Sequence, residues 1–191
     1  MVALDDLFAD LISEDEYRAE AAACGLARLG ETVLSTLEIL LQSSIVDHRW
    51  WAIRTLAQMK EPPSNWLINA LDDPSTEVRE AAALALTAHP TETAIPGLIR
   101  ALSDPEVMLV TLAMYALIEI GNRAIPALLE AYKNAQAKTR IQIMRSLAEI
   151  PDHRSISLML KASEEDSALV NYWAKEGLER LGLNMIYIKP E

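Results

Sequence analysis

The sequence has few of the residues that form cross-links, metal sites and phosphate-binding loops. It contains 1 cysteine, Cys24, in 191 residues, which excludes an internal disulfide and a Cys-x-x-Cys motif. Its 6 glycines form no phosphate-binding loop. Its 3 histidines, His48, His89 and His153, are far apart in the chain and lack the spacing of metal ligands. We therefore expect no metal, no cofactor and no catalytic residue.

Basic side chains are also scarce. The chain has 17 Lys and Arg against 28 Asp and Glu, a formal net charge of −11. Nucleic-acid binding needs cations that displace phosphate counterions, so this balance argues against DNA or RNA as a partner. The acids are concentrated in residues 1–40. This acidic start is interpreted as a solvated terminal cap, with an acidic docking site as the alternative.

Long apolar runs are absent. The longest stretch, Val107 to Ile118, is interrupted only by Thr111 and is too short to cross a bilayer. The first residues are acidic and do not resemble a signal peptide. A single cysteine fits a reducing compartment, so we expect a cytoplasmic protein with no membrane partner.

What the chain has in abundance is a repeat of 30 or 31 residues. Each unit carries a small or apolar residue three positions after a shared reference site, and Leu seven positions after it. The reference sites are Ala19, Arg49, Arg79, Val110, Arg140 and Asn171. This period accommodates two helices and two turns, which predicts an all-α, right-handed solenoid of about six helical hairpins.

The hairpin boundaries follow from the register of the repeat. We place them at about 2–30, 31–60, 61–90, 91–121, 122–151 and 152–182, in one continuous domain of residues 1–191. Pro74 and Pro105 each follow an Asp, which predicts helices that begin at those prolines. Residues 183–191 are β-branched and apolar, and we expect an extended tail that covers the last hairpin or binds another chain.

The third and fourth units resemble a known repeat family. The run from Asp73-Pro74 through Val78-Arg79 and Ala82 to Leu86, followed by Ala94-Ile-Pro-Gly-Leu98, is similar to the short HEAT repeat of phycobilisome-lyase type. The resemblance covers essentially residues 13–182. It implies the solenoid fold but does not select one activity, because such repeats occur in lyase subunits, scaffolds and adaptors.

One face of the second helices carries the candidate site. The sites one and five positions after each reference residue point away from the packed face, yet several of them are aromatic, apolar or arginine, a composition typical of binding surfaces. We predict a concave partner-binding groove lined by Trp50, Arg54, Leu84, Tyr115, Ile141, Arg145 and Tyr172.

Two alternatives involve packing alone. A phase error of one residue would bury part of this row, and Trp51, Trp173, Leu112 and Met114 at flanking sites are assigned to packing between repeats. The arginines at the reference sites, Arg49, Arg79 and Arg140, are expected to pair with the turn acids Asp47, Asp73 and Asp104 rather than with a ligand.

These features favour a non-enzymatic interaction module, a scaffold or adaptor that binds a protein partner of unknown identity. The alternative implied by the resemblance is a bilin-lyase-like subunit acting on a phycobiliprotein. A third hypothesis is an inhibitor or immunity protein whose acidic end masks a basic effector. The oligomeric state stays open.

Overall fold

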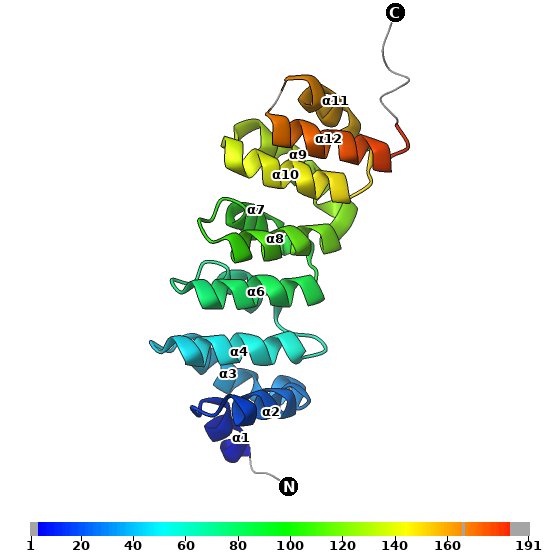
Figure 1. Ribbon diagram of the computed structural model, residues 1–191. Coiled ribbons are helices and arrows are strands. Elements are labelled where there is room, and N and C mark those ends of the chain that lie inside the picture. The colour runs from blue at the N-terminus through cyan, green and yellow to red at the C-terminus, as the bar shows by residue number, and fades with distance from the viewer. Residues whose placement is uncertain (1–3, 166, 184–191) are drawn as a thin grey trace, which may run out of the picture. The chain divides into compact units, whose positions relative to one another are not determined.

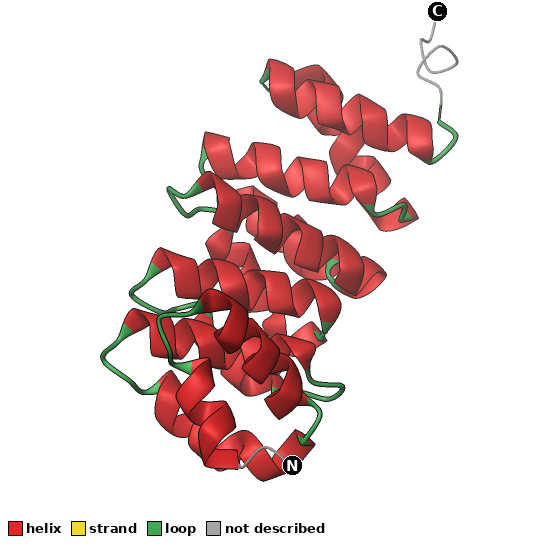
Figure 2. Ribbon diagram, turned by 60° about the horizontal axis from the view of Figure 1, so that its bottom comes forward, coloured by secondary structure: helices red, strands yellow, loops and turns green. Residues whose placement is uncertain are grey.

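The computed structural model describes residues 4–165 and 167–183. Figure 2 shows helices joined by short loops, with no strand in these ranges. Within them, every helix is too short or too polar to span a lipid bilayer. The chain divides after His89 into two compact units, called unit 1 and unit 2 below. The predicted all-helical repeat fold is confirmed.

Unit 1 consists of paired helices in its described part. The pairs are α1 (Leu4–Leu11) with α2 (Glu16–Ala27), α3 (Leu34–Leu41) with α4 (Val46–Gln58), and α5 (Ser64–Ala70) with α6 (Thr76–Ala88). A 3-10 turn, η1 (Gly30–Val33), precedes α3. The second helices α2, α4 and α6 pack against one another in chain order (Figure 1).

Unit 2 repeats this arrangement. Its pairs are α7 (Ile95–Ala101) with α8 (Val107–Ile120), α9 (Ile125–Asn134) with α10 (Ala137–Glu149), and α11 (Ile156–Glu165) with α12 (Ala168–Arg180). The 3-10 turns η2 (Glu92–Ala94), η3 (Gly121–Arg123) and η4 (His153–Ser155) lead into the first helices. The second helices α8, α10 and α12 again pack on one another in order.

The core of each unit lies between its first and second helices. The small and leucine positions of the repeat are all at most 2% exposed. They are Ala22, Ala52, Ala82, Ala113, Ile143 and Ala174, followed by Leu26, Leu56, Leu86, Leu117, Leu147 and Leu178. Burial of each leucine contributes about 1.5–3 kcal/mol, and the small residues let neighbouring helices approach closely. The repeat is therefore a packing pattern.

Local chemistry sets the helix ends. Pro96 and Pro126 stand in the first turns of α7 and α9, where a missing N–H costs little. Gly121 ends α8 with a φ of 68°, a left-handed conformation that favours glycine.

The predicted starts of α6 and α8 are wrong by two residues. These helices begin at Thr76 and Val107 rather than at Pro74 and Pro105. The reason is that the Asp73 carboxylate accepts the Ser75 N–H at 2.8 Å, and the Asp104 carboxylate accepts the Glu106 N–H at 3.0 Å. Each Asp therefore closes a turn around the proline before the helix begins.

The predicted single domain and its hairpin boundaries stay predictions. The expected role of residues 183–191 falls almost entirely outside the described ranges, which end at residue 183.

Candidate functional site

The candidate residues all lie on second helices, and none of them is buried. Unit 1 carries Trp50 and Arg54 on α4 and Leu84 on α6, while unit 2 carries the other four on α8, α10 and α12. The exposed fractions of Leu84, Tyr115 and Tyr172 are 52%, 47% and 52%. We call these positions the second-helix face. Whether the seven residues form one groove, and whether it binds a partner, stays a prediction.

In unit 1 a carboxylate neutralises the arginine of this face. Arg54 Nε and Nη2 donate to the two oxygens of Glu20 on α2, at 3.0 Å and 2.5 Å. The hydrogen bonds to Glu20 raise the pKa of Arg54. Gln58 Nε2 also donates to Glu20 at 3.3 Å, and Cys24 Sγ donates to Gln58 Oε1 at 2.7 Å. The guanidinium of Arg54 is therefore already paired with a carboxylate of the same chain.

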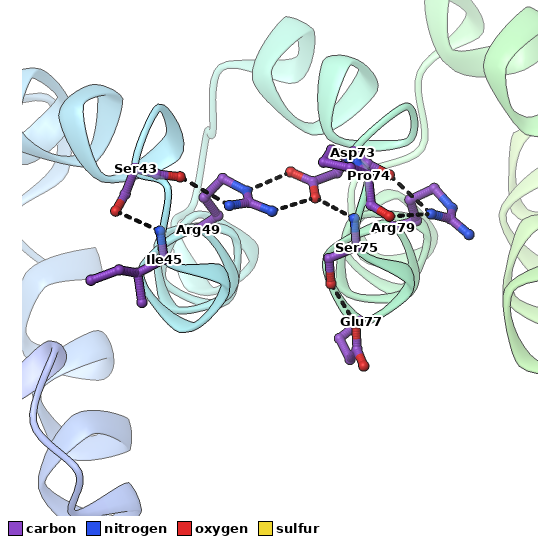
Figure 3. A network of polar contacts seen from close by, with 8 residues as sticks. All are labelled: Ser43, Ile45, Arg49, Asp73, Pro74, Ser75, Glu77 and Arg79. Carbon is purple, nitrogen blue, oxygen red and sulfur yellow. Dashed lines mark hydrogen bonds and ion pairs between the residues drawn. The ribbon is translucent and has the colours of Figure 1, made fainter.

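Arg49, one of the two reference-site arginines of unit 1, is also paired. Arg49 Nε and Nη2 donate to the Asp73 oxygens at 2.8 Å each, and Nη1 donates to the Ser43 carbonyl at 2.9 Å (Figure 3). Both side chains are about one-tenth exposed, at 11% and 10%. The predicted pairing of Arg49 with a turn acid of the adjacent hairpin is confirmed.

The buried pair of Arg49 and Asp73 is stabilised in its charged form by hydrogen bonds. Burial by itself would raise the pKa of Asp73, but hydrogen bonds from Arg49 and from the Ser75 N–H outweigh it and hold the pKa below its ordinary value. Arg79 follows on α6 and donates to the carbonyl of Asp73 at 2.9 Å (Figure 3). It also donates to Thr76 Oγ1 at 3.1 Å. These arginines fasten turns together, which is a structural role.

In unit 2 the arginines of the same repeat positions lie over aromatic rings. The guanidinium carbon of Arg140 is 5.3 Å from the centroid of the Tyr132 ring, and that of Arg145 is 5.0 Å from the Trp173 ring. Such contacts are attractive because the ring face is electronegative. Tyr172 packs edge-on against Trp173, with their ring centroids 5.1 Å apart. Trp173, assigned from the sequence to packing between repeats, is thus half-buried beside the candidate residues.

Arg145 differs from Arg54 in its polar contacts. Its Nε is buried and has no hydrogen-bond partner. Among residues 4–165 and 167–183, no carboxylate is seen to pair with it. Ile141 lies one turn earlier on α10 and is half-buried. The result is a cation beside an aromatic pair, a combination suited to flat or anionic groups.

Metal ligation has no support in the described part of the chain, where no group of three His, Cys, Asp or Glu side chains could hold an ion. His89 Nε2 lies 2.9 Å from the carbonyl oxygen of Ala57, near the end of α4. His48 Nδ1 lies 3.2 Å from Ser43 Oγ. Both rings therefore contact turns or helix ends.

The architecture defines a class, the helical-repeat proteins built from stacked hairpins. Residues 64–140 match the family of HEAT repeats, which confirms the resemblance for that part of the chain. Solved structures with the same fold include a designed armadillo repeat protein in complex with the peptide (KR)4. It has a TM-score of 0.55 and 18% identity, over 94% of this chain and 100% of the other.

Two curated relatives match parts of this chain. One is a bilin biosynthesis protein, RpcF, of Synechococcus sp. (strain WH8020), 37% identical over 49% of this chain and 44% of the relative. The other is a phycobilisome maturation protein of Synechococcus elongatus, 33% identical over 60% of this chain and 55% of the relative. The chain spans about half the length of the curated relatives it matches.

A further fold neighbour is the complex of CpcE and CpcF of phycocyanin lyase from Nostoc sp. PCC7120. It has a TM-score of 0.55 and 22% identity, over 95% of this chain and 78% of the other. At this identity the likeness concerns the fold alone.

These findings correct the functional prediction. The expected scaffold or adaptor without enzymatic activity is wrong, because the curated relatives are named for bilin biosynthesis and phycobilisome maturation. Exposed aromatic and arginine side chains suit a flat pigment as well as a protein surface, so their composition does not distinguish these two kinds of ligand. The inhibitor hypothesis is untested by these relatives and stays a prediction.

Proposed function

We propose that this chain is a bilin-lyase-like subunit, which helps to attach a bilin chromophore to a phycobiliprotein. The observation that carries the proposal is the similarity to the RpcF bilin biosynthesis protein and to the phycobilisome maturation protein, at 37% and 33% identity. The proposed substrates are a bilin, which is a flat conjugated pigment, and an acceptor protein.

The second-helix face supports a role in holding the pigment. In unit 2, its aromatic side chains Tyr115 and Tyr172 are exposed, and aromatic rings stack on flat conjugated groups. In unit 2, Arg145 adds positive charge beside Trp173, whose ring packs against that of Tyr172. A surface of this kind can fix the orientation of a pigment.

Attachment joins a pigment to a protein, so positioning alone can contribute a large part of the rate. Holding two reactants in a reactive orientation removes much of the entropic barrier to their encounter. In this proposal the chain acts by orientation, with the pigment on the second helices of unit 2 and the acceptor beside it. A second protein chain is proposed to take part, as in the complex of CpcE and CpcF.

The test is a reconstituted attachment reaction. An apo-phycobiliprotein subunit and a bilin are incubated with this chain, with a CpcE-type chain, with both, or with neither. The acceptor is then denatured and separated on a gel, and covalently bound pigment is read from its visible absorbance. We expect coloured acceptor to form faster when this chain is present.

A matched pair of variants separates the face from the rest of the surface. The double substitution Tyr115→Ala/Tyr172→Ala on unit 2 should abolish the acceleration. Lys175→Ala, an exposed position on α12 outside the face, should leave it intact. Equal labelling with and without the wild-type chain, in both the presence and the absence of the CpcE-type chain, contradicts the proposal.

A further inference from the structure

The repeat places Arg54 and Arg145 at the same site of their hairpins, five positions after the reference residues Arg49 and Arg140. In unit 1 the partner of Arg54 is Glu20, which lies 34 residues earlier in the chain. The residue 34 positions before Arg145 is Thr111. Unit 2 therefore has no carboxylate at the place from which unit 1 neutralises its arginine.

Thr111 does not replace that carboxylate. Its hydroxyl donates to the Val107 carbonyl of its own helix α8 at 2.9 Å. Glu176, an acid on the same side of α12 as Tyr172, acts electrostatically on Arg180, and no hydrogen bond joins it to Arg145 in the described structure. Arg180 itself is bonded to Glu149. The local carboxylates are thus engaged elsewhere or out of contact.

The guanidinium of Arg145 is left with unused hydrogen-bonding capacity. Its Nε is buried without an acceptor, although the residue as a whole stays partly accessible. The buried Nε lies out of reach of a ligand, but the outer nitrogens of the guanidinium make no hydrogen bond in the described structure, and an arriving carboxylate can accept charge-assisted hydrogen bonds from them. Trp173 holds one face of the guanidinium at 5.0 Å, which orients it without neutralising it.

From this arrangement, we infer that Arg145 binds a propionate carboxylate of a linear tetrapyrrole, while the Tyr172 and Trp173 rings pack against its conjugated system. This inference rests on the proposed function and specifies how the pigment is recognised. The occupant follows from the two chemical features of the site. A small anion would contact the arginine but not the aromatic pair. An uncharged flat ring would contact the aromatic pair but not neutralise the arginine.

The experiment uses biliverdin, a linear tetrapyrrole with propionate side chains, and its dimethyl ester, which keeps the conjugated system but lacks the carboxylates. Binding to the full chain is followed by the change in pigment absorbance. Wild type should bind biliverdin about tenfold more tightly than the ester, the size expected for a hydrogen-bonded charge pair. Arg145→Gln should remove that preference and leave the affinity for the ester unchanged.

A second variant tests the same point while keeping Arg145 and both rings. Thr111→Glu restores the carboxylate that unit 1 has at Glu20, so it should occupy Arg145 and lower biliverdin affinity about tenfold. Thr111→Gln is its neutral control and should bind as wild type does. Circular dichroism confirms that each variant is folded.

The outcomes distinguish the two proposals. Equal binding of biliverdin and its ester by wild type, or unchanged preference in folded Arg145→Gln and Thr111→Glu, overturns the role of Arg145 and leaves the proposed function standing. If wild type binds neither pigment and also fails to accelerate attachment, the proposed function fails, and the inference fails with it.

Discussion

Unit 1 and unit 2 carry arginines at the same two repeat positions but surround them differently. In unit 1, Arg49 pairs with Asp73 and Arg54 pairs with Glu20. In unit 2, the equivalent Arg140 and Arg145 lie over Tyr132 and Trp173. Both arginines of α4 are thus neutralised by carboxylates, whereas both arginines of α10 are held against rings. What an arginine can bind depends on its neighbours more than on its position in the repeat.

This difference in arginine partners holds at these two repeat positions and not across the whole of each unit. Unit 2 has ion pairs of its own, in which Arg154 binds Asp152 at 2.6 Å and Arg180 binds Glu149. These pairs lie outside the two repeat positions. Ion pairing in unit 2 therefore fastens other parts of the surface and leaves Arg145 available.

The largest expected effect comes from the reference-site arginines. Arg49→Met leaves Asp73 as a buried carboxylate without its cation, which should lower the free energy of unfolding by about 3 kcal/mol or more. The equivalent Arg140→Met removes a contact with a ring and should cost less than about 1 kcal/mol. Urea denaturation followed by circular dichroism measures both. Equal losses in the free energy of unfolding would show that the two arginines contribute equally to stability.

A second matched pair compares the small site six positions after the reference residue. At Gly177 in unit 2, a new Cβ would lie 2.6 Å from Met159 Cε and 3.0 Å from the backbone Cα of Ala148. Met159 is fully buried, so Gly177→Ala should destabilise the protein by about 1–3 kcal/mol through overpacking.

At Gly25 in unit 1, the nearest atom to a new Cβ is the tip of Leu7, at 3.3 Å. This half-buried side chain can move aside, and the higher helix propensity of alanine is worth up to about 1 kcal/mol. Gly25→Ala should therefore be neutral or stabilising in thermal unfolding. A loss at Gly25 as large as that at Gly177 would indicate equally tight packing in both units.

A further expected effect is a pH dependence in unit 2. Hydrogen bonds from the Arg154 side chain, opposed by burial and aided by the Arg154 N–H, lower the pKa of Asp152 from 3.8 to about 2. Because this pKa is lower in the folded state, the stability it contributes is fully present above pH 3.8 and is lost as the pH falls toward about 2.

Asp152→Asn should flatten that part of the stability profile while leaving the shape above pH 5 unchanged, since an amide does not titrate near the carboxyl pKa of about 4. The measurement is the urea midpoint as a function of pH for wild type and variant. Parallel profiles through the acidic range would mean that Asp152 has the same pKa in the folded and unfolded states.

Much of the fold could be predicted because it depends on short-range periodicity. Leucine and alanine positions at helical spacing identified the packed faces. The starts of α6 and α8 were misplaced because the Asp73 and Asp104 side chains compete for backbone N–H groups in the turns. That competition depends on side-chain geometry that a residue pattern does not contain.

The helical period also predicts which residues lie on the candidate face, but it does not predict the partners of their side chains. Arg54 and Arg145 looked equivalent, and the importance of Glu20 was missed. The spacing of 34 residues between Glu20 and Arg54 could have suggested the pair, since it is one repeat plus one helical turn. Trp173 carried no comparable signal, because its role beside Arg145 depends on the packing of α10 against α12.

The sequence by itself determined the repeat, the helical hairpins and the direction in which each side chain leaves its helix, because these follow from the period of the α-helix and from the burial of apolar groups. Only the tertiary structure decided which arginines are neutralised. An ion pair needs two groups within a few ångströms of each other, and Glu20 with Arg54, or Arg145 with Trp173, meet only when neighbouring second helices pack side by side.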